Sequence, residues 1–216
     1  MRDRNAPLSP SDVAALAWDK MGGLLPAIVQ DRRSGRVLML GYMNREALQA
    51  TLESGLATFF SRSKQRLWQK GETSGNRLHV SAVHADCDED SLLILAEPAG
   101  PVCHTGTVSC FGNEAMEGPG WLGELAEIVR RRADSGDDGS YTRRLLGEGR
   151  DRIAQKVGEE GVEVALAAVT RGPEGCAEEA ADLLYHLTVL MQSLGFGWDV
   201  VIAELKSRHA LKQPRA

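Results

Sequence analysis

The sequence predicts two domains, an α+β domain rich in strands followed by an all-α helical bundle. Short apolar runs separated by turn residues fill the first half, whereas apolar residues recur at helical spacing in the second half. The net charge of −5 falls entirely on residues 112–216, which carry thirteen basic and eighteen acidic residues, whereas residues 1–111 carry twelve of each. A Gly/Pro/Glu stretch at 112–120 interrupts both patterns. We therefore predict domains at 1–113 and 119–216.

In the first domain, apolar runs bounded by turn residues predict strands. Leu24–Gln30 and Arg36–Met43 flank an Asp/Arg/Ser/Gly turn and indicate a hairpin. Asn44 is a good N-cap for a helix that runs to about Ser54, and Gly55 is a good residue to end it. Further strands are expected at Ala57–Ser61, Leu78–His84 and Leu92–Ala96.

In the second domain, the apolar spacing predicts three helices, at Trp121–Ala133, Arg150–Thr170 and Glu174–Leu194. The long middle helix contains Gly158 and Gly161, and each glycine costs about 1 kcal/mol relative to alanine in a helix interior. The predicted architecture is thus a bundle of amphipathic helices.

Composition excludes several classes of protein. The chain has 216 residues, 43% of them hydrophobic, and no long apolar run, so we expect a folded protein with a proper core. The N-terminus has no apolar signal core, and the four cysteines form no paired framework, which together predict a cytoplasmic protein. The absence of a basic excess argues against general nucleic-acid binding, and nothing indicates a membrane partner.

Segment 86–110 concentrates residues that bind metals. Asp86, Asp88 and Asp90 alternate with Cys87, so on an extended segment the carboxylates would share one face and the thiol would take the other. Clustered carboxylates suit magnesium, whereas thiolates suit zinc. After a Pro/Gly turn come three more candidate ligands: Cys103, His104 and Cys110.

Three cysteines favour a catalytic zinc site over a structural one. A closed site needs four protein ligands, and Cys87, Cys103 and Cys110 supply three, which leaves one position for water. Paired C-x-x-C knuckles, as in zinc ribbons, are absent. Two alternatives stay open: the cysteines are small buried hydrophobes, or His104 completes a closed structural set.

Residues 60–77, FSRSKQRLWQKGETSGNR, combine cationic side chains with a Gly/Ser/Thr turn. Free backbone N–H groups beside positive charge favour anion binding, so a phosphorylated small molecule is the expected ligand. The alternatives are a solvated basic loop and, for Trp68, a place in the core instead of stacking on a base. The candidate substrate contacts here are Arg62, Ser63, Lys64, Trp68, Thr73, Ser74, Gly75 and Asn76.

The runs FSRSKQRLWQKGETSGN, DCDED and CHTGTVSCF resemble, in that order, the phosphoribosyl-AMP cyclohydrolases of histidine biosynthesis. The resemblance covers about residues 18–111. It implies a zinc and magnesium enzyme, with zinc on the three cysteines named above and magnesium on the three aspartates. It also implies an obligate homodimer whose zinc site takes cysteines from both chains. The implied reaction opens the purine ring of phosphoribosyl-AMP, and His104, with His84 as runner-up, is the candidate for proton transfer.

The two long helices of the second domain carry acidic residues at helical spacing, and antiparallel packing would bring them face to face. Clustered carboxylates repel one another unless a cation lies between them, and magnesium is the expected one. The alternative is two amphipathic helices with acidic outer faces. The candidate ligands are Glu159, Glu160, Glu163, Glu179 and Asp182.

The runs KVGEEGVEVALAA and EEAADLLYHLTVLM resemble phosphoribosyl-ATP pyrophosphohydrolase, an all-α, MazG-like enzyme, over about residues 121–210. The resemblance implies magnesium on the five acids and phosphate contacts from Lys156, together with Thr142, Arg143 and Arg144. Glu160 and Glu163 are the candidate catalytic carboxylates. The product of a phosphoribosyl-ATP pyrophosphohydrolase is phosphoribosyl-AMP, the substrate whose purine ring the first domain is expected to open.

A different class of protein accounts for the same patterns. The chain could be a zinc-stabilised binding module with a helical dimerisation domain and no activity. That hypothesis predicts four zinc ligands, no dependence on magnesium and no nucleotide turnover. An assay of the purified protein with phosphoribosyl-ATP separates the two hypotheses.

Overall fold

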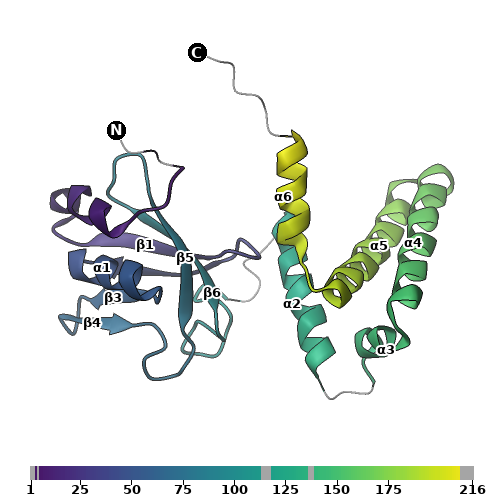
Figure 1. Ribbon diagram of the computed structural model, residues 1–216, viewed down its shortest axis with the longest axis horizontal. Coiled ribbons are helices and arrows are strands. Elements are labelled where there is room, and N and C mark those ends of the chain that lie inside the picture. The colour runs from purple at the N-terminus through teal and green to yellow at the C-terminus, as the bar shows by residue number, and fades with distance from the viewer. Residues whose placement is uncertain (1–2, 4, 113–117, 136–138, 210–216) are drawn as a thin grey trace, which may run out of the picture. The chain divides into compact units, whose positions relative to one another are not determined.

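The computed structural model describes residues 3, 5–112, 118–135 and 139–209. The chain divides into two compact units, Met1–Gly120 and Trp121–Ala216 (Figure 1). Part of the predicted linker, residues 113–117, lies outside the described residues. Each unit is considered by itself below.

The N-terminal unit is built on a four-stranded sheet in the order β2-β1-β6-β5. Strand β6 runs parallel to β1, and the other neighbours are antiparallel. A second sheet is the antiparallel hairpin β3-β4. The elements are the 3-10 helices η1 (Pro10–Ala15), η2 (Trp18–Met21) and η3 (Gly118–Gly120), the strands β1 (Leu25–Asp31), β2 (Val37–Met43), β3 (Thr58–Ser61), β4 (Arg66–Gln69), β5 (Leu78–Ala85) and β6 (Leu92–Pro98), and helix α1 (Arg45–Ser54).

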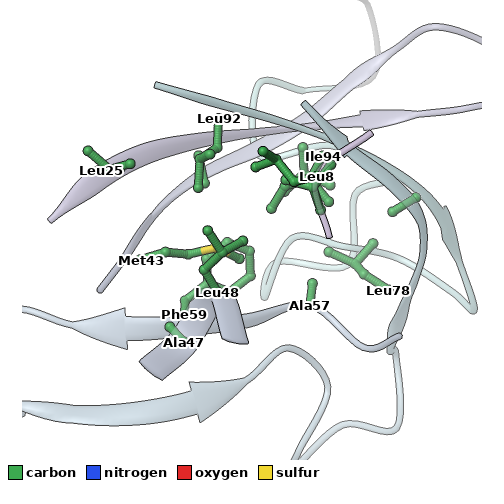
Figure 2. Packing of buried hydrophobic residues seen from close by; sticks show 14 of the residues in the cluster. Leu8, Leu25, Met43, Ala47, Leu48, Ala57, Phe59, Leu78, Leu92 and Ile94 are labelled. Carbon is green, nitrogen blue, oxygen red and sulfur yellow. The ribbon is translucent and has the colours of Figure 1, made fainter. Parts of the chain in front are cut away.

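The core of this unit lies between one face of the large sheet and the layer formed by α1 and β3 (Figure 2). Alternate residues of β1 point into it, and Val29 and Leu25 are fully buried. The ring of Phe59 packs so closely on Gly41 that a Cβ there would lie 2.4 Å from the ring. Burial of each large apolar side chain stabilises the fold by about 1.5–3 kcal/mol.

The opposite face of the sheet leaves a row of apolar side chains exposed. Leu40, Ile28 and Leu93 are direct neighbours on β2, β1 and β6. Their exposed fractions are 46%, 39% and 36%. No described element of this unit covers this row, which we call the outer sheet row.

Helix α1 begins and ends as its capping residues predict. The Asn44 side chain accepts a hydrogen bond of 2.8 Å from the Ala47 backbone N–H. Gly55 takes the left-handed conformation, with φ of 70°, and its N–H donates to the Thr51 carbonyl. Both capping predictions are confirmed.

The C-terminal unit contains helices alone among its described residues, and its core is small. Fully or nearly fully buried apolar side chains come from four helices: Val129, Leu145, Ile153 and Val189. α4 and α5 lie side by side and are joined through Arg171 (Figure 1). The helices are α2 (Trp121–Asp134), α3 (Tyr141–Glu148), α4 (Arg150–Thr170), α5 (Gly172–Leu194) and α6 (Trp198–His209).

The predicted fold class is confirmed: a strand-rich α+β unit precedes a helical one. Besides the short 3-10 helices, three elements were not predicted, namely β4, α3 and α6. Strand β4 lies within the segment that the sequence suggested as an anion-binding loop, and it pairs with β3. Among the described residues no single helix has the length and apolarity to cross a membrane; only the pair α5 and α6, bent by 103°, meets those criteria together.

Candidate active sites

The three aspartates of segment 86–90 come together on a turn. Strand β5 ends at Ala85, so the prediction of an extended segment with alternating faces is wrong. Asp86 Oδ1 accepts backbone N–H bonds from Asp90 at 3.0 Å and Ser91 at 3.2 Å, and these bonds fold the segment back. Glu89 has a φ of 62°, which is uncommon without glycine. As a result, ligand oxygens of Asp86, Asp88 and Asp90 lie within 4.8 Å of one another.

A lysine distant in sequence lies at this acidic turn. Lys20 Nζ is 2.9 Å from Asp88 Oδ2 and 3.6 Å from Asp90 Oδ2. Its hydrogen bond holds the pKa of the Asp88 carboxyl below its usual value. No local sequence pattern marks this residue, because 68 positions separate Lys20 from Asp88.

Cys103 and Cys110 lie on one loop, whose conformation β2 fixes. The Cys110 N–H donates to the Leu38 carbonyl at 2.8 Å, and the buried Ser109 hydroxyl donates to Val37 at 2.8 Å. The Thr105 hydroxyl donates to Cys103 Sγ at 3.1 Å. This bond, followed by hydrogen bonds from the Thr105 backbone and the Thr107 side chain, lowers the pKa of the Cys103 thiol to about 6. Partial burial and the neighbouring Cys103 raise the pKa of Cys110. The loop thus favours the thiolate form of Cys103 and places the Cys110 sulfur near it.

Cys87 does not complete this pair within one chain. It is exposed, and its Sγ lies 3.9 Å from Asp88 Oδ1. Among the described residues, no group of three close metal ligands includes Cys87, Cys103 or Cys110. His104 is exposed, with Nδ1 3.9 Å from the Cys103 sulfur. A single chain therefore offers an incomplete sulfur site.

The basic segment forms the β3-β4 hairpin and the loop that follows it. Trp68 is partly buried and its ring centroid lies 5.1 Å from that of Phe59, so this indole packs on the core. Arg62, by contrast, stacks over the Tyr42 ring at 3.8 Å and stays accessible. The remaining predicted contacts are exposed except Asn76, which is half-buried: Ser63, Lys64, Thr73, Ser74 and Gly75.

The 71–76 loop lies against the cysteine loop. Asn76 Nδ2 donates to the Pro101 carbonyl at 3.0 Å. A Cβ on Gly100 would lie 2.5 Å from Asn76 Oδ1, and one on Gly71 would lie 2.5 Å from the Asn76 backbone. These close approaches need glycine at both positions. They hold the predicted anion-binding loop against Gly100 and Pro101, which directly precede the segment that carries Cys103.

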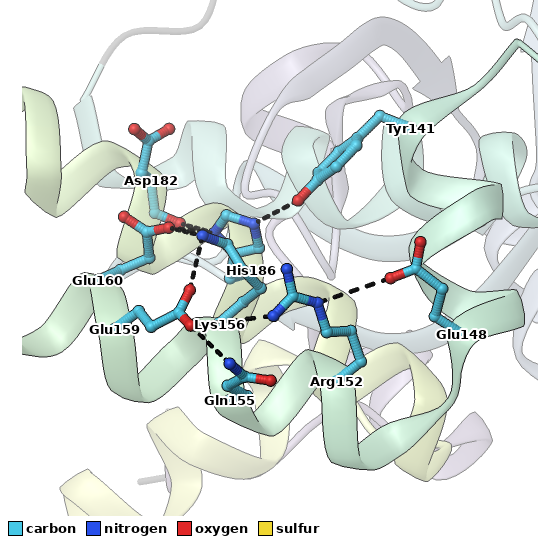
Figure 3. Close-up of polar contacts among 9 residues, drawn as sticks. All are labelled: Tyr141, Glu148, Arg152, Gln155, Lys156, Glu159, Glu160, Asp182 and His186. Carbon is cyan, nitrogen blue, oxygen red and sulfur yellow. Dashed lines mark hydrogen bonds and ion pairs between the residues drawn. The ribbon is translucent and has the colours of Figure 1, made fainter.

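In the C-terminal unit, α4 and α5 bring acidic residues together (Figure 3). Ligand oxygens of Glu160, Glu179 and Asp182 lie within 4.8 Å of one another. Glu160 is 95% buried. The pKa of the adjacent Glu163 is raised, and the main cause is the negative charge of Glu160. Glu159 is not part of this group; it accepts hydrogen bonds from Lys156 and Gln155 instead.

Basic residues neutralise this cluster too. Lys156 Nζ lies 2.9 Å from Glu160 Oε1 and 3.0 Å from Glu159 Oε2, and these bonds raise the pKa of Lys156. Arg171, which the sequence did not single out, pairs with Glu179. Three of the acids predicted to bind magnesium therefore already form ion pairs with basic side chains of the same chain.

Helix α3 is attached to α5 by two side-chain bonds. Tyr141 Oη lies 3.1 Å from His186 Nε2, and Thr142 Oγ1 lies 2.7 Å from the Tyr185 hydroxyl. His186 Nδ1 lies 2.9 Å from the Asp182 carbonyl, which only accepts, so Nδ1 carries the proton. Thr142 is fully buried. The predicted phosphate contact of Thr142 is thus not supported, because its hydroxyl is enclosed and already bonded.

Comparison with known proteins assigns each unit to a family. The phosphoribosyl-AMP cyclohydrolase model matches residues 39–112, and the phosphoribosyl-ATP pyrophosphohydrolase model matches residues 122–209. The histidine biosynthesis bifunctional protein HisIE of Escherichia coli (strain K12) is 55% identical over 196 residues, 90% of this chain and 95% of that protein.

Two Vibrio relatives carry the same name. The HisIE protein of Vibrio cholerae is 54% identical and the match covers 89% of this chain and 92% of that protein. That of Vibrio vulnificus is 51% identical, with coverage of 92% and 97%. Since similarity extends over both units, the chain belongs to the family of histidine biosynthesis bifunctional proteins, in which a phosphoribosyl-AMP cyclohydrolase domain precedes a phosphoribosyl-ATP pyrophosphohydrolase domain.

Proposed function

We propose that this bifunctional hydrolase performs two consecutive reactions, with the domains in the opposite order along the chain. The domain at 119–216 hydrolyses phosphoribosyl-ATP to phosphoribosyl-AMP and pyrophosphate. The domain at 1–113 then opens the purine ring of phosphoribosyl-AMP. The observation that carries the proposal is the match of one family model to each unit, together with a metal-ligand cluster in each. Four free cysteines support a reducing compartment, the cytoplasm.

The sulfur ligands of the first domain fit zinc. Cys103 and Cys110 present two soft donors on one loop, and the lowered pKa of Cys103 favours the thiolate that zinc needs. Because Cys87 stands apart within one chain, we propose that it joins the pair from a second copy. Bound zinc lowers the pKa of a coordinated water to about 7. His104, next to Cys103 and open to solvent, is proposed to transfer the proton to the ring nitrogen.

A homodimer would also explain the uncovered apolar side chains. The outer sheet row exposes Leu40, Ile28 and Leu93 side by side on three strands. On α4, Val162 and Leu166 are 60% and 57% exposed and lie one turn apart. Contiguous exposed apolar residues mark interaction surfaces. We propose that a second copy covers them.

The oxygen ligands of both domains fit magnesium, because three carboxylates converge in each. In the first domain we assign the ion to Asp86, Asp88 and Asp90, and the phosphoribosyl group to the exposed basic and hydroxyl residues from Arg62 to Asn76. Trp68 is assigned a supporting place in the core under this loop.

In the second domain we assign magnesium to Glu160, Glu179 and Asp182, with Glu163 close by. Glu159 would not bind the ion directly but would position Lys156, whose ammonium forms ion pairs with both Glu159 and Glu160. An ion at Glu160 would free the Lys156 ammonium for a phosphate oxygen. Either Glu160 or Glu163 serves as the base toward water.

Incubation of the purified full-length protein with phosphoribosyl-ATP, zinc and magnesium tests the proposal. Pyrophosphate should appear first, and the ring-opened product should follow with a lag, since it needs phosphoribosyl-AMP. Supplied phosphoribosyl-AMP should be opened without a lag. Release of pyrophosphate without ring opening, or neither reaction, would contradict the proposal.

A further inference from the structure

The acidic turn of the N-terminal unit already holds a cation of the chain itself. Lys20 Nζ lies 2.9 Å from Asp88 Oδ2, 3.1 Å from the Asp88 carbonyl and 3.6 Å from Asp90 Oδ2. The ammonium thus donates two hydrogen bonds to Asp88 and forms a longer ion pair with Asp90. Two of the three oxygens belong to carboxylates that converge as candidate metal ligands.

The segment that carries Lys20 is fixed in place by the fold. Trp18, on the same 3-10 helix, is 1% exposed, and its Nε1–H donates to the Val13 carbonyl at 2.7 Å. The Ala17 N–H donates to the Glu89 carbonyl at 2.9 Å, which joins η2 directly to the acidic turn. This segment precedes residues 39–112, to which the cyclohydrolase model matches.

We propose that Lys20 is a positioning residue that keeps Asp88 and Asp90 together without metal and must withdraw when a divalent cation binds. The inference rests on the magnesium site proposed above. A divalent cation held by Asp88 and Asp90 would lie close to this ammonium, and like charges a few ångströms apart repel each other, less so where solvent and salt screen them. Lys20 therefore lowers the affinity of the site for the ion.

An exposed ion pair between a lysine and an aspartate is often without consequence. Lys20 differs in that it contacts two acids of one cluster, and a backbone hydrogen bond ties its helix to that cluster. Its side chain is half exposed, so it can swing into solvent when an ion enters. The two carboxylates would thus already lie together before the divalent cation binds, but the affinity of the site for that cation would be low.

Manganese binding tests this inference without an activity assay. Mn²⁺ is titrated into the zinc-loaded full-length protein and the free ion is followed by EPR. Lys20→Met should raise the affinity of the N-terminal site about tenfold at low salt, and less at high salt. Lys20→Arg, which keeps the positive charge near the site, should stay within about twofold of wild type. The matched control Arg33→Met, which also removes one exposed, paired charge, should leave the affinity unchanged.

An Asp88→Asn variant separates this inference from the proposed function. It should remove one manganese site, and in its background Lys20→Met should have no further effect. If Asp88→Asn leaves the number of sites unchanged, the magnesium site itself is wrong. If that site is lost but Lys20→Met leaves the affinity unchanged or lowers it, only the role of Lys20 is overturned.

Discussion

The two units gather three carboxylates in contrasting ways. In the N-terminal unit the ligands lie within five residues, and hydrogen bonds from Asp90 and Ser91 to Asp86 fold the turn. In the C-terminal unit Glu160 comes from α4, whereas Glu179 and Asp182 come from α5. The first cluster depends on local backbone geometry, and the second depends on how two long helices pack. Similar sets of oxygen ligands can therefore be held either by a local turn or by the packing of two helices.

Both clusters are balanced by internal cations. Lys20 pairs with the turn, while Lys156 and Arg171 pair with the helical cluster. Like charges brought within a few ångströms destabilise a fold unless cations offset them. In each unit, repulsion among the carboxylates is thus offset by basic residues, which come from different kinds of element in the two units.

Loss of a sulfur ligand should reduce activity more than any change in the two acidic clusters. Cys103→Ser removes one of the two sulfurs on the cysteine loop and should lower ring opening by roughly a thousandfold, since several kcal/mol of metal catalysis are lost. Bound zinc, measured by elemental analysis, should fall in parallel. Pyrophosphate release should stay at the wild-type rate. Cys176→Ser, in the other unit, is the control and should keep its zinc; equal zinc content in both variants would refute the assignment.

The next effect concerns the helical cluster. Glu160→Gln keeps the size of the side chain but removes the buried charge, and should lower pyrophosphate release by about a hundredfold or more while ring opening of supplied phosphoribosyl-AMP persists. Glu178→Gln on α5, exposed and outside the cluster, should behave like wild type. The two reactions are followed separately by a pyrophosphate assay and by ultraviolet absorbance. Loss of both reactions in Glu160→Gln would mean that the units are not independent.

The smallest effect tests how closely helix packing holds the second cluster. A Cβ on Gly175 would lie 2.5 Å from Arg171 Cβ, so Gly175→Ala should disturb the α4–α5 junction and cost about 1–3 kcal/mol in the free energy of unfolding. On Gly158 a Cβ would meet nothing within 4 Å, so Gly158→Ala should stabilise α4 by about 1 kcal/mol. Urea denaturation followed by circular dichroism measures both. Equal changes in the two variants would show that the junction is not tightly packed.

Much of the fold could be predicted from local patterns. Capping residues placed α1, and apolar periodicity placed most strands and the long helices, because these signals act within a few residues. Strand β4 was missed because Arg66–Gln69 is short and polar and becomes a strand by pairing with β3. Helix α3 was missed for a related reason: Leu145 finds its core partners only on other helices.

The two-unit organisation, the fold class and the candidate ligands follow from residue type and spacing along the chain. Which of these candidates meet depends on the tertiary structure. It folded Asp86–Asp90 into a turn instead of an extended face, left Cys87 apart from Cys103 and enclosed Thr142. It also brought Lys20 to Asp88. Contacts between residues distant in sequence depend on how whole elements pack, and no local pattern encodes them.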